Sequence, residues 1–476
     1  MKQLKFIILL LLLIPFLSGN LFAHKRAKYN IVIDTDAGID DFRALTYFMS
    51  SRDYNINCIT TVDGILDPNT AVNYINGIRN IYHHEGIPLG EGGKFNASKK
   101  YTNHALQYWT KFFPEIEDFK PEPAIPLLYS SINNEQNRTI IIAMGPLSNI
   151  SELFNKYPEI IPKIEIILWY SDFDKKPIGY NYEQNPGAYE SILEYKVPVK
   201  IVSGNNIRFS TDFFEACKDL NSIYSKTVAD FFAEKTNLEY YLWDDLLPLY
   251  LSYPTMFKEE RLEEYLIKVD PIPDGFYEIL VTSILNSEKS DEGVVFNEVP
   301  TSGFLLRKDV NTVAEELIDK HGYVEFKIAS LTSEIHSHMG IYSIMGAKMG
   351  LRIMEYLHAG LDEIEIISYA GSKPPISCFN DGLQVGTGST IGYGTIKIDT
   401  AQDIRPAALV IYNNREVLFS IKPEVIKEIK EDVGNIIKAH GLESEMYWIK
   451  LREMSIEKYW LNKSRFDIFE IKTVKN

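Results

Sequence analysis

A dense group of acidic residues directly follows a short apolar segment near the N-terminus. Four carboxylates fall within eight residues there: Asp34, Asp36, Asp40 and Asp41. Charges this close repel one another, and a bound divalent cation offsets that repulsion. Carboxylate oxygens select hard ions such as Ca²⁺ or Mg²⁺, and Gly38 permits a tight turn that brings the first pair towards the second. Helix capping by Asp40 explains one or two of these residues but not all of them.

A second group of metal-binding residue types lies in the C-terminal half. His336 and His338 open a helix-like segment rich in small residues, and Cys378 follows further along the chain. Two histidines and one cysteine can form a three-ligand Zn²⁺ site with an open position. By itself, a His-x-His pair is equally compatible with histidines that are hydrogen-bonded inside the fold or exposed at its surface.

Further motifs accompany the acidic run, and together they resemble a known family. The run is similar to the Asp-Thr-Asp-Pro-Gly-x-Asp-Asp signature of the inosine-uridine nucleoside hydrolases, with Ala37 in place of the usual Pro. The other similar segments are Gly145-Pro146-Leu147-Ser148-Asn149, Asn181 with Asn185-Pro186-Gly187-Ala188, and Trp243-Asp244 followed by Tyr250-Leu251 and Pro254. The resemblance covers roughly residues 29–300.

The resemblance implies a calcium-dependent hydrolase that cleaves the N-ribosyl bond of a small-molecule riboside. The Ca²⁺ ligands would be Asp36, Asp41, Asp244 and the backbone carbonyl of Ser148. Water and two ribose hydroxyls would complete seven or eight oxygens, which suits Ca²⁺ better than Mg²⁺. Asp36 would also be the catalytic base, taking a proton from the water that attacks the anomeric carbon.

The same resemblance assigns the residues around the sugar. Asp40 would accept a hydrogen bond from a ribose hydroxyl, Asn181 would bind the sugar, and Asp34 would support the loop. The transition state of glycosyl transfer is oxocarbenium-like, so a site rich in carboxylates stabilises its developing positive charge.

Several positions depart from the family pattern. Gly64-Ile65 lacks a sugar-contacting Asn, and Trp169-Tyr170-Ser171 and Gly179-Tyr180-Asn181 replace other family segments. Trp243 stands where the family has a His that serves as an acid for the leaving base in some members. An indole cannot donate a proton in that way; it either stacks on an aromatic leaving group or a sugar or is a packing residue. A standard nucleoside is therefore not the only substrate to expect.

The C-terminal half resembles a second family. Cys378, the run Asn380-Asp381-Gly382-Leu383-Gln384-Val385 and the glycine-rich residues 386–394 follow the His-x-His pair. This order is similar to FmdE, the family of the E component of formylmethanofuran dehydrogenase, over roughly residues 313–420. The resemblance implies a metal site, with Zn²⁺ as the expected ion, at His336, His338 and Cys378. No molybdenum or methanofuran chemistry follows from it.

Alternation of strand-like and helix-like segments predicts the elements that must position these residues. The expected strands are 30–33, 56–62, 138–144, 164–170 and 197–202, and the expected helices are 40–51, 69–83 and 149–155. This order predicts an α/β fold, a nucleoside-hydrolase-like and mainly parallel sheet flanked by helices. A second, smaller α+β domain is expected after it. Ligands in such sheets bind beyond the carboxyl ends of the strands.

Length and local composition divide the chain of 476 residues. Residues 1–23 have a basic start and an apolar run, which predicts a secretory signal peptide and a periplasmic or secreted protein without a stable membrane span after cleavage. We expect a hydrolase domain at 24–305, a metal-binding domain at 306–440 and a C-terminal tail at 441–476. The net charge of -16 makes nucleic-acid polymers poor partners. A homo-oligomer is possible.

Two other functions remain open. The chain is alternatively a catalytically inactive, Ca²⁺-dependent sugar- or nucleoside-binding protein, because one family Asn and one family His are missing. A third interpretation places the main activity in the C-terminal domain.

Overall fold

The computed structural model describes residues 27–115, 119–204, 207–220, 222–233, 240–273, 276–286, 299, 301, 303, 305–360, 363–399 and 403–475. The expected signal peptide, residues 1–23, lies outside the described residues. Among those that are described, no helix has the length and apolar character needed to cross a bilayer.

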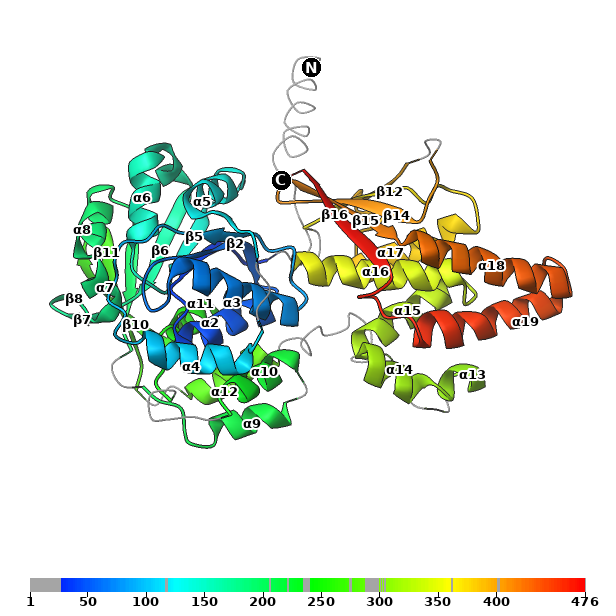
Figure 1. Ribbon diagram of the computed structural model, residues 1–476, viewed down its shortest axis with the longest axis horizontal. Coiled ribbons are helices and arrows are strands. Elements are labelled where there is room, and N and C mark those ends of the chain that lie inside the picture. The colour runs from blue at the N-terminus through cyan, green and yellow to red at the C-terminus, as the bar shows by residue number, and fades with distance from the viewer. Residues whose placement is uncertain are drawn as a thin grey trace, which may run out of the picture.

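The first half of the chain builds one large sheet covered by helices (Figure 1). Its strand order is β10-β11-β9-β6-β5-β1-β2-β3-β4. The strands are β1 (Tyr29–Thr35), β2 (Tyr54–Thr61), β3 (Leu89–Glu91), β4 (Glu122–Pro123), β5 (Thr139–Ala143), β6 (Ile164–Tyr170), β9 (Val199–Val202), β10 (Phe257–Glu263) and β11 (Leu266–Pro271). Every neighbouring pair is parallel except β10 with β11. The predicted α/β class with a mainly parallel sheet is confirmed.

Both faces of this sheet are buried because apolar side chains alternate along its central strands. In β1, Ile31 and Ile33 belong to one apolar cluster and Val32 to another. The helices are α2 (Ile39–Ser50), α3 (Pro68–Ile81), α4 (Thr102–Phe112), α5 (Ala124–Asn133), α6 (Ser148–Lys156), α7 (Tyr180–Gln184), α8 (Pro186–Glu194), α9 (Phe213–Asp219), α10 (Ile223–Phe231), α11 (Leu246–Ser252) and α12 (Tyr277–Leu285). A hairpin of β7 (Asp172–Asp174) and β8 (Lys176–Ile178) stands apart from the sheet, and short 3₁₀ turns lie at η1 (Pro158–Lys163) and η2 (Pro254–Met256).

The second half forms a smaller α+β body with its own core. Its sheet has the order β13-β12-β14-β15-β16, with β12 and β13 parallel and the remaining pairs antiparallel. The strands are β12 (Glu365–Ser368), β13 (Ile396–Ile398), β14 (Ala407–Tyr412), β15 (Arg415–Ile421) and β16 (Phe469–Lys475). The helices are α13 (Lys308–Asn311), α14 (Ala314–His321), α15 (Tyr323–Ile335), α16 (Ile341–Leu357), α17 (Phe379–Thr387), α18 (Pro423–His440) and α19 (Glu445–Met454), with the short turns η4 (Ile376–Cys378) and η5 (Ser455–Leu461).

The end of the chain belongs to this second body. Residues 441–476, which the sequence suggests as a separate tail, contain α19, η5 and β16. β16 pairs along β15 as an edge strand, and Tyr459 and Trp460 are buried in the second core. The second body therefore continues past residue 440.

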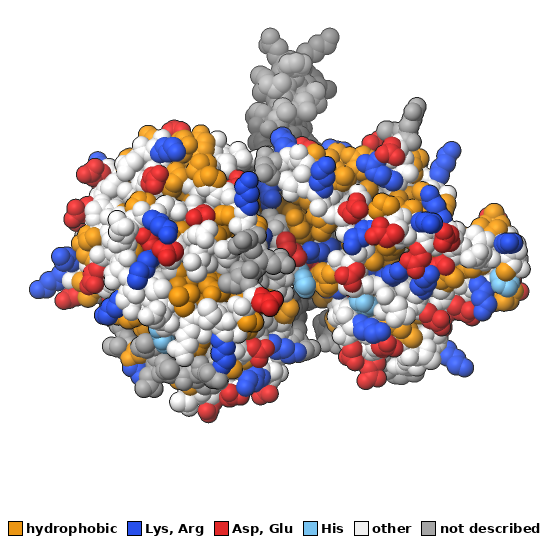
Figure 2. Space-filling view, viewed as in Figure 1, with side chains coloured by type: hydrophobic (Ala, Val, Ile, Leu, Met, Phe, Trp, Pro, Cys, Tyr) orange, Lys and Arg blue, Asp and Glu red, His pale blue; other side chains and the backbone are white. Residues whose placement is uncertain are grey.

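The two bodies touch through polar contacts made by α16 and its flanking residues. The backbone N–H of Gly86 donates to the Tyr356 carbonyl at 2.7 Å, and Arg352 pairs with Glu85 at 2.9 Å. The Nε2 atom of His358 lies 2.7 Å from the Met49 carbonyl at the end of α2. On the face drawn in Figure 2, acidic and basic side chains are interspersed over both bodies, so that face presents no continuous basic surface for a phosphate backbone.

Candidate functional site

The acidic run lies at the carboxyl edge of the central sheet, where β1 gives way to α2. β1 ends at Thr35 and α2 begins at Ile39, so Asp36 lies in the connecting loop and Asp40 and Asp41 in the first helical turn. Ala37 has a φ of 58°. Proline is restricted to a φ near −65°, so this loop conformation excludes the Pro of the family signature.

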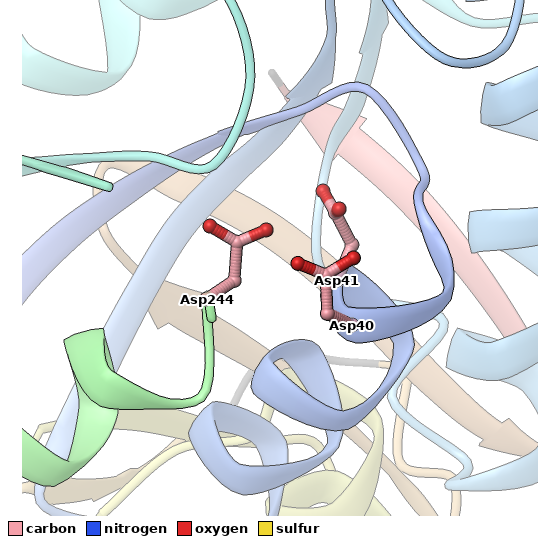
Figure 3. A group of neighbouring side chains, drawn as sticks. All are labelled: Asp40, Asp41 and Asp244. Atoms are coloured by element: carbon pink, nitrogen blue, oxygen red, sulfur yellow. The ribbon is translucent and has the colours of Figure 1, made fainter. Parts of the chain in front are cut away.

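Three carboxylates converge at this edge (Figure 3). Ligand atoms of Asp40, Asp41 and Asp244 lie within 4.8 Å of one another, and all three residues are buried. Asp41 also accepts hydrogen bonds from the Thr35 hydroxyl and, at 3.0 Å, from the Gly38 backbone N–H. Asp244 comes from the segment just before α11, so the group joins two parts of the chain that are distant in sequence.

Asp36 lies beside this group rather than within it. Its Oδ2 accepts the backbone N–H of Ile65 at 3.0 Å. Its Oδ1 is buried and accepts no hydrogen bond. Gly64 allows this close packing, because a Cβ at that position would lie 2.2 Å from Asp36 Oδ2. The structure thus groups Asp40, rather than Asp36, with Asp41 and Asp244.

Two further predicted residues have structural partners. The Thr60 hydroxyl and the Asn149 amide donate to Asp34 Oδ1 at 2.6 and 2.8 Å, so Asp34 ties β1 to β2 and α6. Ser148 begins α6, and its hydroxyl accepts the Asn185 amide at 2.9 Å. Ser148 is not among the residues that line the cavity described below.

The electrostatics of the acidic group show that positive charge is lacking. Burial, followed by repulsion from Asp40, raises the pKa of Asp41 to about 7. Burial and the charge of Asp41 hold the pKa of Asp36 well above its usual range. Burial and Asp40 do the same to the pKa of Asp244. Carboxylates buried together in this way ionise readily only when a cation joins them.

A cavity of about 340 Å³ opens beside the carboxylates. Asn181 lines it and is fixed by its amide, which donates to the carbonyls of Met144 and Tyr170 at 3.1 and 3.2 Å. Trp243 also lines it and stacks on Tyr241 with ring centroids 5.4 Å apart. The other lining residues are Asp36, Ile39, Asp40, Asp41, Ile65, Tyr101, His104, Ala105, Met144, Tyr170, Ser171, Asp172, Ile178, Gly179, Tyr180 and Asp244.

The predicted zinc ligands of the second body are only partly assembled. The rings of His336 and His338 lie 4.2 Å apart, but His336 Nδ1 pairs with Asp381 Oδ2 at 2.7 Å. Across the described residues, the acidic group at the first site is the only set of three His, Cys, Asp or Glu ligand atoms within 4.8 Å of one another. Cys378 lies in η4, where burial and then the charge of Asp381 raise its pKa. A zinc site at His336, His338 and Cys378 stays a prediction.

The large sheet and its acidic edge agree with a comparison to known families. The model of the inosine-uridine preferring nucleoside hydrolases matches residues 31–283, more than half of the chain. The chain belongs to this nucleoside hydrolase family. A second family model, described as FmdE, molybdenum formylmethanofuran dehydrogenase operon, matches residues 335–461. Both resemblances seen in the sequence are confirmed, and the second match reaches into residues 441–476.

Individual relatives of this nucleoside hydrolase are distant. The non-specific ribonucleoside hydrolase RihC of Salmonella schwarzengrund is 24% identical over 140 residues, 28% of this chain and 45% of the relative. An uncharacterized protein of Schizosaccharomyces pombe is 28% identical over 188 residues, 36% of this chain and 54% of that protein. The chain thus spans about half the length of the curated relatives it matches.

Two solved nucleoside hydrolases are also similar. A plant enzyme has a TM-score of 0.48 at 17% identity, over 55% of this chain and 99% of its own. An inosine-uridine preferring enzyme from Bacillus anthracis has a TM-score of 0.47 at 16% identity, over 54% of this chain and 99% of its own.

Sequence reasoning missed the ion pair that holds the two halves of this nucleoside hydrolase site together. Arg43 of α2 donates to both carboxylate oxygens of Asp245 at 2.7 Å, and both side chains are fully buried. Arg43 also donates to the Tyr241 carbonyl at 2.7 Å. The pair therefore anchors the segment carrying Trp243 and Asp244 against the helix that carries Asp40 and Asp41. Its only sequence signals are a charge within an apolar helix face and the doubled aspartate at 244–245.

Proposed function

We propose that this chain is a Ca²⁺-dependent hydrolase of N-ribosyl bonds that converts a nucleoside or related riboside to ribose and a free base. The observation that carries the proposal is the acidic group at the carboxyl edge of the sheet, which adjoins a cavity large enough for a small ligand. Family membership supports the same reaction class.

The donor set fits a hard divalent ion. Asp36 Oδ1 and Asp244 Oδ1 are buried oxygens that accept no hydrogen bond, and ligand atoms of Asp40, Asp41 and Asp244 lie close together. Several carboxylate oxygens with no nearby cation are the chemistry that Ca²⁺ satisfies. We therefore assign the ion to Asp36, Asp41 and Asp244, with the carbonyl of Ser148 as a further expected ligand and Asp40 directly beside it. A bound Ca²⁺ would orient the ribose diol and make the attacking water more acidic.

The chain's own residues supply the remaining steps. Asp36 accepts the proton of the attacking water, for which a buried oxygen without a hydrogen bond is available. Asp40 accepts a hydrogen bond from a ribose hydroxyl, and Asn181, fixed by two backbone carbonyls, contacts the sugar. The carboxylates stabilise the positive charge that develops on the sugar ring as the bond to the base breaks.

Release of free ribose from a panel of nucleosides and related ribosides tests this proposal. The competing function is a Ca²⁺-dependent binding protein without turnover, which the departures from the family pattern at Ile65 and Trp243 favour. Ligand-induced stabilisation without any release of ribose would support that alternative and contradict hydrolysis.

Chelation should destabilise the protein, and more strongly at higher pH. The raised pKa of Asp41, about 7 against an ordinary 3.8, means that the metal-free fold is favoured by protonation. That contribution to stability is fully present below about pH 4 and is lost as the pH rises through about 7. Ca²⁺ binds the ionised form, so the loss of melting temperature on chelation should be larger near about pH 8 than near about pH 5. An unchanged melting curve at the higher pH would contradict the calcium site.

We also propose a metal site in the second body, most simply for Zn²⁺. His336 Nε2 is buried without a hydrogen bond while Asp381 orients the ring through Nδ1, the usual carboxylate support of a ligand histidine. Elemental analysis of the full chain should find bound metal that His338→Ala reduces and that substitution of an exposed histidine, His440→Ala, leaves unchanged. Equal metal content in all three proteins would remove the proposal.

A further inference from the structure

The cavity beside the acidic group carries an excess of negative charge. Five of its lining residues are aspartates: Asp36, Asp40, Asp41, Asp172 and Asp244. None of the described residues that line it is Lys or Arg. One divalent cation balances only two of these carboxylates when all are ionised, so the occupied site still attracts positive charge.

Asp172 is the aspartate that lies outside the proposed catalytic and metal-binding set. It begins the β7–β8 hairpin, is half-buried, and accepts the Tyr170 hydroxyl at 3.2 Å. A Cβ on Gly179 would lie 3.3 Å from its Oδ2, so a side chain there would crowd the carboxylate. Its oxygens are thus held at the cavity wall beside the segment that carries Asn181.

Aromatic side chains form much of the remaining wall. Trp243 stacks on Tyr241 with the two ring planes 2° apart, which leaves the indole fixed where it lines the cavity. Tyr101 and Tyr180 meet edge to face with centroids 5.4 Å apart. The faces of indole and phenol rings attract cations, and they also stack on flat heteroaromatic rings.

Trp243 raises a chemical problem for neutral bases. When the bond from the anomeric carbon to the base nitrogen breaks, the electron pair stays on that nitrogen. A neutral base therefore leaves as an anion unless an acid protonates it, and an indole N–H is not such an acid. A base that is already cationic leaves as a neutral molecule and needs no proton.

These observations converge on one substrate class. We propose, building on the riboside hydrolysis proposed above, that the site selects ribosides whose base is a heteroaromatic cation, with Asp172 and Trp243 recognising that base. Pyridinium ribosides and N7-alkylated purinium ribosides share this chemistry. Water adds to the anomeric carbon, the carbon–nitrogen bond breaks, its electron pair neutralises the ring, and Asp36 takes one proton from the water. The products are ribose and a neutral base.

The test compares matched ribosides that differ in charge. Nicotinamide riboside and 7-methylguanosine are the cations, and inosine and guanosine are the neutral partners. Each rate is divided by the uncatalysed rate of the same compound, because cationic ribosides are intrinsically more labile. We expect the corrected kcat/KM of the cations to exceed that of the neutral ribosides by about tenfold or more, the effect of one favourable charge contact.

Two variants assign the selectivity to the wall of the cavity. Asp172→Asn should lower kcat/KM for the cations by about three- to tenfold and change that for inosine by less than about twofold. Asp174→Asn removes the same charge two residues away at an exposed position and should leave both values unchanged. Asp172→Asn with an intact preference for cations would overturn the proposal.

The remaining outcomes separate this inference from the function beneath it. Equal or better corrected turnover of neutral ribosides would overturn the selectivity and point to His104, the imidazole in the cavity wall, as a proton donor. Riboside hydrolysis itself would then still stand. If no riboside, charged or neutral, releases ribose, the proposed function fails and this inference fails with it.

Discussion

Replacing Asp36 by Asn should reduce the rate of the chemical step by about 10²–10⁴. The amide keeps nearly the same shape and one oxygen for the metal, but it cannot accept the proton of the attacking water. Binding of ribose should change little, and a loss of kcat without a matching loss of binding marks a role in the transition state. Steady-state kinetics together with calorimetric titration of ribose separates the two effects.

A neighbouring variant provides the control for that experiment. Asp40→Asn should weaken sugar binding as well as turnover, because the proposed partner of Asp40 is a ribose hydroxyl. An Asp36→Asn protein with near-wild-type turnover would refute Asp36 as the base, even if Ca²⁺ binding at the site is then demonstrated.

Removing the carboxylate of Asp245 should have the largest effect on stability. Arg43 and Asp245 are both fully buried, so Asp245→Ala leaves a guanidinium without its counter-charge. Breaking a buried pair in this way costs about 3–5 kcal/mol in the free energy of unfolding. The adjacent Asp244 should also lose its position, so Ca²⁺ binding should weaken. Denaturant unfolding and calcium titration measure the two losses.

The exposed ion pair between Lys218 and Glu215 offers a matched control. Both side chains are about half exposed, so Glu215→Ala should change stability by no more than about 0.5 kcal/mol. Similar small effects of Asp245→Ala and Glu215→Ala would show that the buried pair does not hold the site together.

Local patterns predicted the frame of the first half well. The expected helix at 40–51 is α2, and the expected strand at 164–170 is β6. Apolar periodicity and the ends of helices are local properties, so they are readable without knowledge of the fold. The acidic run was conspicuous for the same reason, since its charges are neighbours in sequence.

Contacts between distant segments were not readable in this way. Asp244 joined the site through a family resemblance alone, and the pairing of Arg43 with Asp245 crosses most of the first half of the chain. Helix α17 lies in a glycine-rich stretch where intrinsic propensity argues against helix. It forms because those glycines allow close packing: a Cβ on Gly382 would lie 2.2 Å from the backbone of Ala347 in α16. Tertiary packing there overrides the local preference.

The most direct test of the central claim is release of ribose by the chelated and the Ca²⁺-reconstituted protein. A riboside identified in the substrate panel is incubated with metal-free protein, with the same protein after addition of Ca²⁺, and with reconstituted Asp36→Asn. The account predicts ribose and free base in equal amounts from the reconstituted wild type, and almost none from the other two. Equal ribose release with and without Ca²⁺, or from the Asp36→Asn protein, would contradict it.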